Sequence, residues 1–307
     1  MKHLFIFLLL SSICLPLLVC SQTEARVDTF RLFYLGGQSN MDGYGFNKEL
    51  PDSLDMTYRD TWIFHGNTRP DDQPGGGEGL WAPLKPGHGV GFTSNGKTNH
   101  LSDRFGVELS FARALQRLYP GEQVALIKYS RGGTSIDSAA AGSAGCWEPD
   151  YGGHRGINQY DHFLATVRHA MADEDINDDG RKDCLIPQGI IWMQGESDAA
   201  FTEGIARRYY PHLKRLMDLM RATFRRDDLP VVIGKISDSW NARDGKVWDH
   251  GDLVQYAQEK FARQDACAAI VRTTRDYDYS DPWHYNSEGY IDLGGEFARA
   301  IYRLNGK

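Results

Sequence analysis

Residues 30–41 read Phe-Arg-Leu-Phe-Tyr-Leu-Gly-Gly-Gln-Ser-Asn-Met, and this stretch determines how the rest of the chain is interpreted. The apolar run from Phe30 to Leu35 predicts a buried strand, and the two glycines after it predict a sharp turn. Ser39 lies in this turn, where a hydroxyl is held in the open with backbone N–H groups beside it. A serine nucleophile needs that environment, although turns of this composition are also common in proteins without catalytic function.

The C-terminal region supplies a candidate base for Ser39. Residues 281–284 read Asp-Pro-Trp-His, and Pro282 favours an extended conformation of Asp281. A short turn then brings the Asp281 carboxylate to Nδ1 of His284, which fixes the tautomer and leaves Nε2 for a nucleophile. Alone, the same spacing suits a capping aspartate and a surface histidine. Combined with the serine turn, it indicates a Ser-His-Asp triad.

Two segments in the middle of the chain predict an oxyanion hole. The apolar run Val124–Tyr129 is followed by Ser-Arg-Gly-Gly-Thr-Ser-Ile, in which Gly133 lacks a Cβ and its N–H is therefore able to approach a ligand closely. The apolar run Gly189–Met193 is followed by Gln-Gly-Glu-Ser-Asp, in which Gln194 offers a side-chain amide. A plain strand-end turn explains the first segment equally well.

These four segments resemble the motif blocks of the SGNH, or GDSL-like, hydrolases. The most similar branch contains the sialate O-acetylesterases and carbohydrate esterase family 6, which includes acetylxylan esterases. The blocks occur in the order of that family and extend over most of the chain. They are Gly37-Gln-Ser-Asn-Met41, Gly132-Gly-Thr-Ser-Ile136, Trp192-x-Gln-Gly-Glu-Ser-Asp198 and Asp281-x-x-His284.

The resemblance implies a serine esterase that removes O-acetyl groups from a carbohydrate such as acetylated xylan or acetylated sialic acid. It implies that Ser39 is the nucleophile, His284 the base and Asp281 the carboxylate that orients the base. The implied oxyanion hole consists of the Ser39 N–H, the Gly133 N–H and the Gln194 side chain, and the chemistry needs no cofactor. Two alternatives stay open: a catalytically silent glycan-binding module on the same fold, and an esterase for lipid or aryl esters.

Apolar runs alternate with amphipathic segments along the chain. This pattern predicts a three-layer α/β/α sandwich with a central, mainly parallel five-stranded sheet, of the SGNH or flavodoxin-like type. The expected strands are Phe30–Leu35, Val124–Tyr129, Gly189–Met193, Val231–Ile236 and Ala269–Arg272. The expected helices are Val107–Tyr119, Tyr160–Asp173, Glu203–Arg226, Leu253–Gln264 and Ser287–Leu304. Loops at the carboxyl ends of such strands carry the catalytic residues.

Composition and charge restrict the class of protein. Of 307 residues, 41% are apolar and 24% are charged, which suits one globular domain with a sizeable core. The resemblance implies that residues 22–307 form this domain as a single carbohydrate esterase domain. The formal net charge is −7, and no basic stripe alternates with aromatic residues. We therefore expect no binding of nucleic acid, and the resemblance implies an acetylated glycan as the partner.

The first residues resemble a secretory signal peptide over residues 1–21. Lys2 and His3 precede an apolar run, and Pro16 interrupts that run, which argues against a membrane-spanning helix. An exported protein, periplasmic or secreted, is therefore expected. Cys20 allows a lipid anchor in principle, but Val19 is a poor residue before a lipidated cysteine.

One acidic segment has the pattern of a calcium loop. Asp175, Asn177, Asp179 and Asp183 alternate as calcium ligands do, but Ile186 stands where such a loop usually has a bidentate glutamate. A structural calcium ion and a solvated acidic loop are both compatible with this pattern.

Cysteines and tryptophans complete the set of candidate residues. Export favours one disulfide among Cys146, Cys184 and Cys267, and the sequence does not choose the pair. Aromatic faces suit sugar rings, so the tryptophans near the expected site and in the long loops are candidates for substrate contact. Packing in the core is the alternative role for each of them. They are Trp283, Trp147 and Trp81.

Overall fold

The computed structural model describes residues 27–67, 76–153, 155–243 and 245–306. The expected signal peptide over residues 1–21, with Cys20 in it, lies outside the described residues. Within the described part, no helix combines the length and the apolar character needed to cross a membrane.

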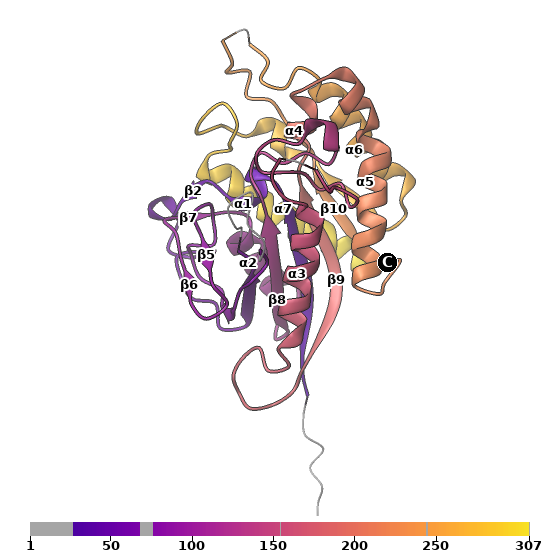
Figure 1. The fold of residues 1–307 in the computed structure, drawn as a ribbon. Helices are drawn as coiled ribbons and strands as arrows, with labels where there is room; N and C mark the ends of the chain where they lie inside the picture. The colour runs from indigo at the N-terminus through magenta and orange to yellow at the C-terminus, as the bar shows by residue number, and fades with distance from the viewer. Residues whose placement is uncertain (1–26, 68–75, 154, 244, 307) are drawn as a thin grey trace, which may run out of the picture.

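A central sheet organises the fold (Figure 1). It has seven strands, in the order β11-β10-β9-β1-β8-β3-β4. Neighbouring strands are parallel except for the β3–β4 pair, which is antiparallel. The expected α/β class with a mainly parallel sheet is confirmed, but the expected number of five strands is wrong. The strands are β1 (Asp28–Gly37), β3 (Thr61–His65), β4 (Trp81–Pro83), β8 (Gln123–Ser130), β9 (Asp183–Met193), β10 (Val231–Gly234) and β11 (Ala268–Val271).

The two additional strands have weak local signals. β3 is short, and its apolar core is only the run Trp62-Ile-Phe64 before His65. Its strand conformation depends on pairing with β8, which is distant in sequence. β4 contains Pro83, which lacks an N–H donor and is tolerated because β4 is an edge strand.

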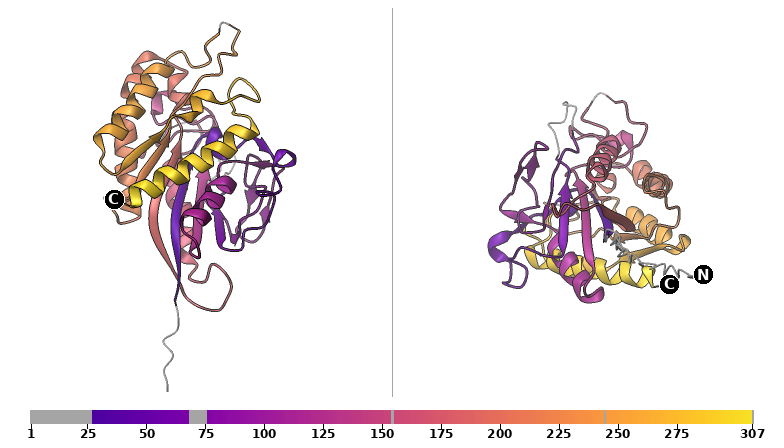
Figure 2. Two further views of the ribbon diagram at one scale, coloured as in Figure 1. Left: turned by 180° about the vertical axis from the view of Figure 1, so that it is seen from behind. Right: turned by 90° about the horizontal axis from the view of Figure 1, so that it is seen from below.

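Helices cover both faces of the sheet and complete the three layers. α2 and α7 pack together on one face, and α3 and α5 cover the other, with α6 packed beside α5 (Figure 2). Short antiparallel pairs join β2 (Gly45–Phe46) to β7 (Arg104–Phe105) and β5 (Thr93–Ser94) to β6 (Asn99–His100). The helices are α1 (Ser39–Asp42), α2 (Glu108–Leu118), α3 (Gln159–Ala172), α4 (Glu196–Ala199), α5 (Glu203–Thr223), α6 (Gly251–Gln264) and α7 (Ser287–Asn305).

The central strand β1 explains how the fold positions a site. Its side chains alternate between the faces, yet Phe30, Leu32, Phe33 and Leu35 are all buried. Such a continuously buried strand requires helices on both faces. β1 ends at Gly37 between the ends of β8 and β9, so three loops meet at this edge of the sheet.

The three cysteines of the described chain are free, so the expected disulfide is not formed. Cys184 lies on β9 and Cys267 directly precedes β11, with β10 between these two strands. Two strand spacings of about 4.8 Å separate the backbones by roughly 10 Å, which is beyond the reach of a disulfide. Cys146 is buried in the loop that follows β8, where it pairs by backbone bridges with Ser135 and Asn158.

Candidate active site

β1 ends in a tight turn that places Ser39 at the start of α1. Gly37 has a φ of 146°, and a Cβ at this position would lie 1.9 Å from the carbonyl oxygen of Met193. Only glycine therefore fits between β1 and the end of β9. The backbone N–H of Gln38 donates to the same Met193 oxygen at 2.9 Å. These close contacts fix the turn that carries Ser39.

A cavity of about 540 Å³ lies over the carboxyl ends of the central strands. Ser39 lines it from the end of β1, Gly133 from the end of β8, and His284 from the loop before α7. The structure thus brings together three of the site residues expected from sequence. A cavity of this volume accommodates a small ligand such as one sugar residue.

His284 is held by Asp281 in the expected way. Its Nδ1 lies 2.7 Å from Asp281 Oδ2, and the other carboxylate oxygen accepts the backbone N–H groups of Trp283 and His284 at 2.7 and 2.9 Å. Burial acts to raise the pKa of Asp281, but the hydrogen bond from His284 and these N–H groups outweigh it, so the pKa is lowered. Tyr44 stacks on the imidazole, with ring centroids 3.6 Å apart.

Asn40, the residue after the serine, ties the serine turn to the histidine loop. Its Nδ2 donates to Glu196 Oε1 at 2.9 Å and to the Trp283 carbonyl oxygen at 3.1 Å. Its Oδ1 accepts from the Tyr290 hydroxyl at 2.7 Å. The relative position of Ser39 and the histidine loop is therefore set by one buried amide.

Glu196 gives a testable dependence of stability on pH. Burial raises its pKa from 4.5 to about 7, and its second oxygen, Oε2, is buried with no hydrogen-bond partner in the structure. The folded protein then holds a proton that the unfolded chain releases between pH 4.5 and 7. The contribution of Glu196 to stability therefore falls as pH rises through this window, by about 3 kcal/mol in total.

The substitution Glu196→Gln is expected to remove this dependence while keeping an oxygen for the Asn40 amide. The free energy of unfolding of the variant, relative to that of the natural protein, should therefore rise between pH 5 and pH 8. Urea unfolding of both proteins at the two pH values measures the difference. A difference that does not change with pH would contradict a protonated, buried Glu196.

Of the glycines Gly132 and Gly133, the second has the backbone N–H group that is free to donate a hydrogen bond to a ligand. The Gly132 N–H faces the Asp42 carboxylate, which also accepts from the Ser130 hydroxyl. Gly133 has a φ of 70°, nothing lies within 4 Å of where its Cβ would be, and its N–H has no partner in the described structure. Its N–H is therefore available to a ligand in the cavity.

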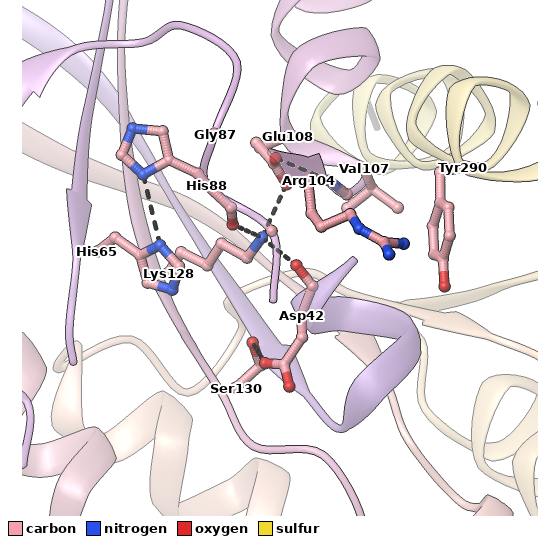
Figure 3. Close-up of polar contacts among 12 residues, drawn as sticks. Asp42, His65, Gly87, His88, Arg104, Val107, Glu108, Lys128, Ser130 and Tyr290 are labelled. Atoms are coloured by element: carbon pink, nitrogen blue, oxygen red, sulfur yellow. Dashed lines mark hydrogen bonds and ion pairs between the residues drawn. The ribbon is translucent and has the colours of Figure 1, made fainter. Parts of the chain in front are cut away.

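A buried lysine, Lys128, contacts Asp42 at the end of α1, the helix that begins with Ser39 (Figure 3). Lys128 and Glu108 are fully buried, and their side chains form an ion pair of 2.8 Å between Nζ and Oε2. Lys128 Nζ also donates to the carbonyl oxygens of Asp42 and His88 at 2.9 and 2.7 Å. Three acceptors satisfy all three N–H groups of the ammonium, so the buried charge is fully paired.

Lys128→Met is expected to lower the free energy of unfolding by about 3–5 kcal/mol, because Glu108 is left buried without its partner. The double variant Lys128→Met with Glu108→Gln removes that uncompensated charge and should recover part of the loss. Urea unfolding of the single and double variants measures both effects. A double variant no more stable than Lys128→Met would contradict this explanation.

The structure does not bring Gln194 into the cavity. Its side chain is fully buried, and Nε2 donates to the Thr134 carbonyl oxygen at 3.0 Å and to Asp198 at 2.7 Å. Its Oε1 accepts from the Tyr209 hydroxyl at 3.0 Å. Both amide hydrogens are thus engaged inside the protein, and neither is presented to a bound ester. The expectation that Gln194 is an oxyanion donor disagrees with this arrangement.

Asp198, which accepts a hydrogen bond from Gln194, also holds the backbone of a neighbouring loop. Its carboxylate accepts the backbone N–H groups of Ile136 and Asp137 at 3.0 Å, in the segment that follows β8. Burial raises its pKa to about 6, although these hydrogen bonds favour the charged form. Asp198 therefore connects the loop after β9 to the loop that carries Gly133.

Only one of the three candidate tryptophans lines the cavity. Trp283 does so, and half of its surface is exposed. Trp147 is fully buried and donates from Nε1 to Thr134 Oγ1, and Trp81 donates to the carbonyl oxygen of Ala170 away from the cavity. Trp147 and Trp81 therefore pack within the protein and are not placed to contact a substrate in this cavity. Other aromatic residues of the cavity wall have no local sequence motif that marks them: Tyr44, Phe201 and Trp248.

The acidic segment after α3 is ordered by its own backbone. Asp175 accepts from the N–H groups of Asp179 and Gly180, Asn177 and Asp179 also accept local N–H groups, and Asp183 accepts from Ile176. Among the described residues, no three His, Cys, Asp or Glu side chains are grouped so as to hold a metal ion. The structure gives calcium no support here, and calcium binding stays a prediction.

Comparison with known proteins agrees with the geometry. The model of the carbohydrate esterase, sialic acid-specific acetylesterase family matches residues 29–303. No curated protein sequence matches the chain. Among solved structures, a protein from Arabidopsis thaliana is 19% identical with a TM-score of 0.59, and the match covers 91% of this chain and 99% of that one.

Two further structures share the fold. A carbohydrate acetylesterase from Xanthomonas citri is 17% identical with a TM-score of 0.58, and the match covers 90% of this chain and 57% of that one. The protein NanS is 18% identical with a TM-score of 0.56, and the match covers 91% and 98% of the two chains. At these identities the structures establish the fold, and the family model establishes the family. The chain belongs to the carbohydrate esterase, sialic acid-specific acetylesterase family, and it is a carboxylic ester hydrolase.

Proposed function

We propose that this carbohydrate acetylesterase hydrolyses O-acetyl esters through a triad of Ser39, His284 and Asp281. The observation that carries the proposal is the common cavity: the Asp281-oriented imidazole and the serine turn line the same walls, beside Gly133. Because Nδ1 of His284 is engaged by the carboxylate, Nε2 is the nitrogen available to a serine hydroxyl.

The reaction has two steps, acetylation of Ser39 and hydrolysis of acetyl-Ser39, and His284 accepts and then donates a proton in each. His284 Nε2 takes the proton from Ser39 Oγ as that oxygen attacks the acetyl carbonyl carbon, and the N–H groups of Ser39 and Gly133 stabilise the oxyanion. His284 then gives the proton to the departing sugar oxygen, which leaves acetyl-Ser39. His284 Nε2 then takes a proton from a water molecule that attacks the acetyl carbonyl carbon. It gives this proton to Ser39 Oγ as the acyl bond breaks, which restores the serine and releases acetic acid, ionised to acetate.

The substrate is an acetylated glycan, with acetylated xylan and acetylated sialic acid as the two candidates. The exposed ring of Trp283 at the cavity wall supports a sugar substrate, because an aromatic face stacks on a sugar ring. The basic, apolar and cut-site pattern of residues 1–21 supports an exported enzyme, periplasmic or secreted, that meets such glycans outside the cytoplasm.

Acetate release measured across acetylated xylan, acetylated sialic acid and a small aryl acetate tests this function. We expect release from at least one of the two glycans at a kcat/KM well above that for the aryl acetate. Preference for the aryl acetate would favour a non-carbohydrate esterase. Glycan binding without acetate release would favour a catalytically silent module.

A further inference from the structure

The side chain of Gln38, the residue before the nucleophile, has its amide oxygen fixed by three donors. Gln38 Oε1 accepts from the backbone N–H groups of Gly195 and Ser197 at 3.2 and 3.3 Å, and from Gln194 Nε2 at 3.3 Å. Two of these donors are backbone groups that cannot act as acceptors. The oxygen end of the amide is therefore assigned, and the NH2 group must point the other way.

The nitrogen end of the same amide has no partner within the described residues. Gln38 is 3% exposed, its Nε2 donates no hydrogen bond to a described residue, and this nitrogen atom is not itself fully buried. The nitrogen thus keeps access to solvent, and Gln38 lines the same cavity as Ser39. The NH2 group is therefore available to an acceptor atom of a ligand bound in the cavity.

We propose that the Gln38 amide N–H is the side-chain donor of the oxyanion hole, in the place that family resemblance gives to Gln194. This inference rests on the proposed function. Gln38 adjoins Ser39 on one turn, and Gln38, Ser39 and Gly133 all line the same cavity. The three N–H groups donated to Oε1 polarise the amide and strengthen it as a donor.

Gln194 then acts on the reaction indirectly, because it contacts Gln38 and holds the loop that carries Gly133. Its Nε2 contacts Gln38 Oε1, and its remaining bonds to Thr134 and Asp198 hold the loop after β8. It is a positioning residue, and Gln38 is the catalytic residue. The competing idea is that Gln38 only connects the serine turn to the Gly195–Ser197 turn, as an acceptor.

Gln38→Glu separates donation from acceptance. The glutamate keeps an oxygen for the Gly195 and Ser197 N–H groups but loses the NH2 donor and puts negative charge near the oxyanion. We expect kcat to fall roughly a hundredfold or more at the pH plateau, with a much smaller change in KM. The melting temperature should stay close to that of the natural protein. Gln38→Ala should show the same kinetic loss with lower stability.

Gln194→Ala is the matched comparison. It should lower the melting temperature, because four buried hydrogen bonds are lost, while kcat of the folded variant falls by less than about tenfold. A Gln38→Glu enzyme with ordinary kcat would overturn the proposal. So would a stable Gln194→Ala enzyme whose kcat loss exceeds that of Gln38→Ala.

The rate of covalent labelling of Ser39 by a fluorophosphonate distinguishes failure of this inference from failure of the proposed function. When Ser39 attacks the fluorophosphonate, negative charge develops on the phosphoryl oxygen, as it does on the carbonyl oxygen of an ester. This reaction needs no sugar substrate. Slower labelling of Gln38→Glu supports the donor role even if no acetylated glycan is hydrolysed. Equal labelling rates, or no labelling of the natural protein, overturn the role.

Discussion

Replacement of Ser39 by alanine is expected to lower kcat/KM for acetate release by several orders of magnitude, because no covalent acetyl intermediate can form. The fold should persist, since Ser39 lines the cavity and the turn is held by Gly37 and by backbone hydrogen bonds. Acetate release from an acetylated glycan and the melting temperature of both proteins measure the two expectations.

Ser143→Ala is the matched control for this prediction. Ser143 also lines the cavity, but it has no place in the proposed triad or oxyanion hole. Its removal should leave kcat close to that of the natural enzyme. Near-normal turnover by a folded Ser39→Ala enzyme would remove Ser39 from the role of nucleophile.

His284→Ala is expected to have the second largest effect, a loss of roughly a thousandfold or more in kcat, because the serine loses its base and the leaving oxygen its acid. Asp281→Asn should approach this loss. Its Oδ1 still accepts the N–H groups of Trp283 and His284, so the loop keeps its shape. Its NH2 group, however, donates to Nδ1 and forces the proton onto Nε2, where the base is needed.

Steady-state kinetics of both variants on the same acetylated glycan, with circular dichroism for the fold, measure this effect. Tyr44→Leu is a useful third variant, because it removes the ring that stacks on the imidazole without touching its hydrogen bonds. It should cost less than either triad substitution. An Asp281→Asn enzyme with unchanged kcat would show that the 2.7 Å contact has no part in catalysis.

The sequence predicts the site best where function depends on a local motif. A glycine turn after an apolar strand locates Ser39, and four consecutive residues locate Asp281 and His284. The layered fold follows from the apolar runs, because a strand buried on both faces has a distinctive composition. β3 is harder to predict, since its strand conformation depends on pairing with β8, which lies some sixty residues later in the chain.

Residues that act through burial and orientation are not predictable in this way. Gln38 and Gln194 are both glutamines at strand ends, and sequence alone does not tell which amide faces the cavity. The same limitation applies to Trp147, which is a core residue, and to Trp283, which is exposed at the cavity. Orientation of this kind depends on contacts between loops that are far apart in sequence.

Covalent labelling of Ser39 with a fluorophosphonate, located by peptide mass spectrometry and compared with residual acetate release, tests the central claim most directly. The account predicts a single adduct on Ser39 and a loss of acetate release in proportion to the fraction labelled. Full acetate release by a completely labelled enzyme, or a loss of activity that follows an adduct elsewhere in the chain, would contradict it.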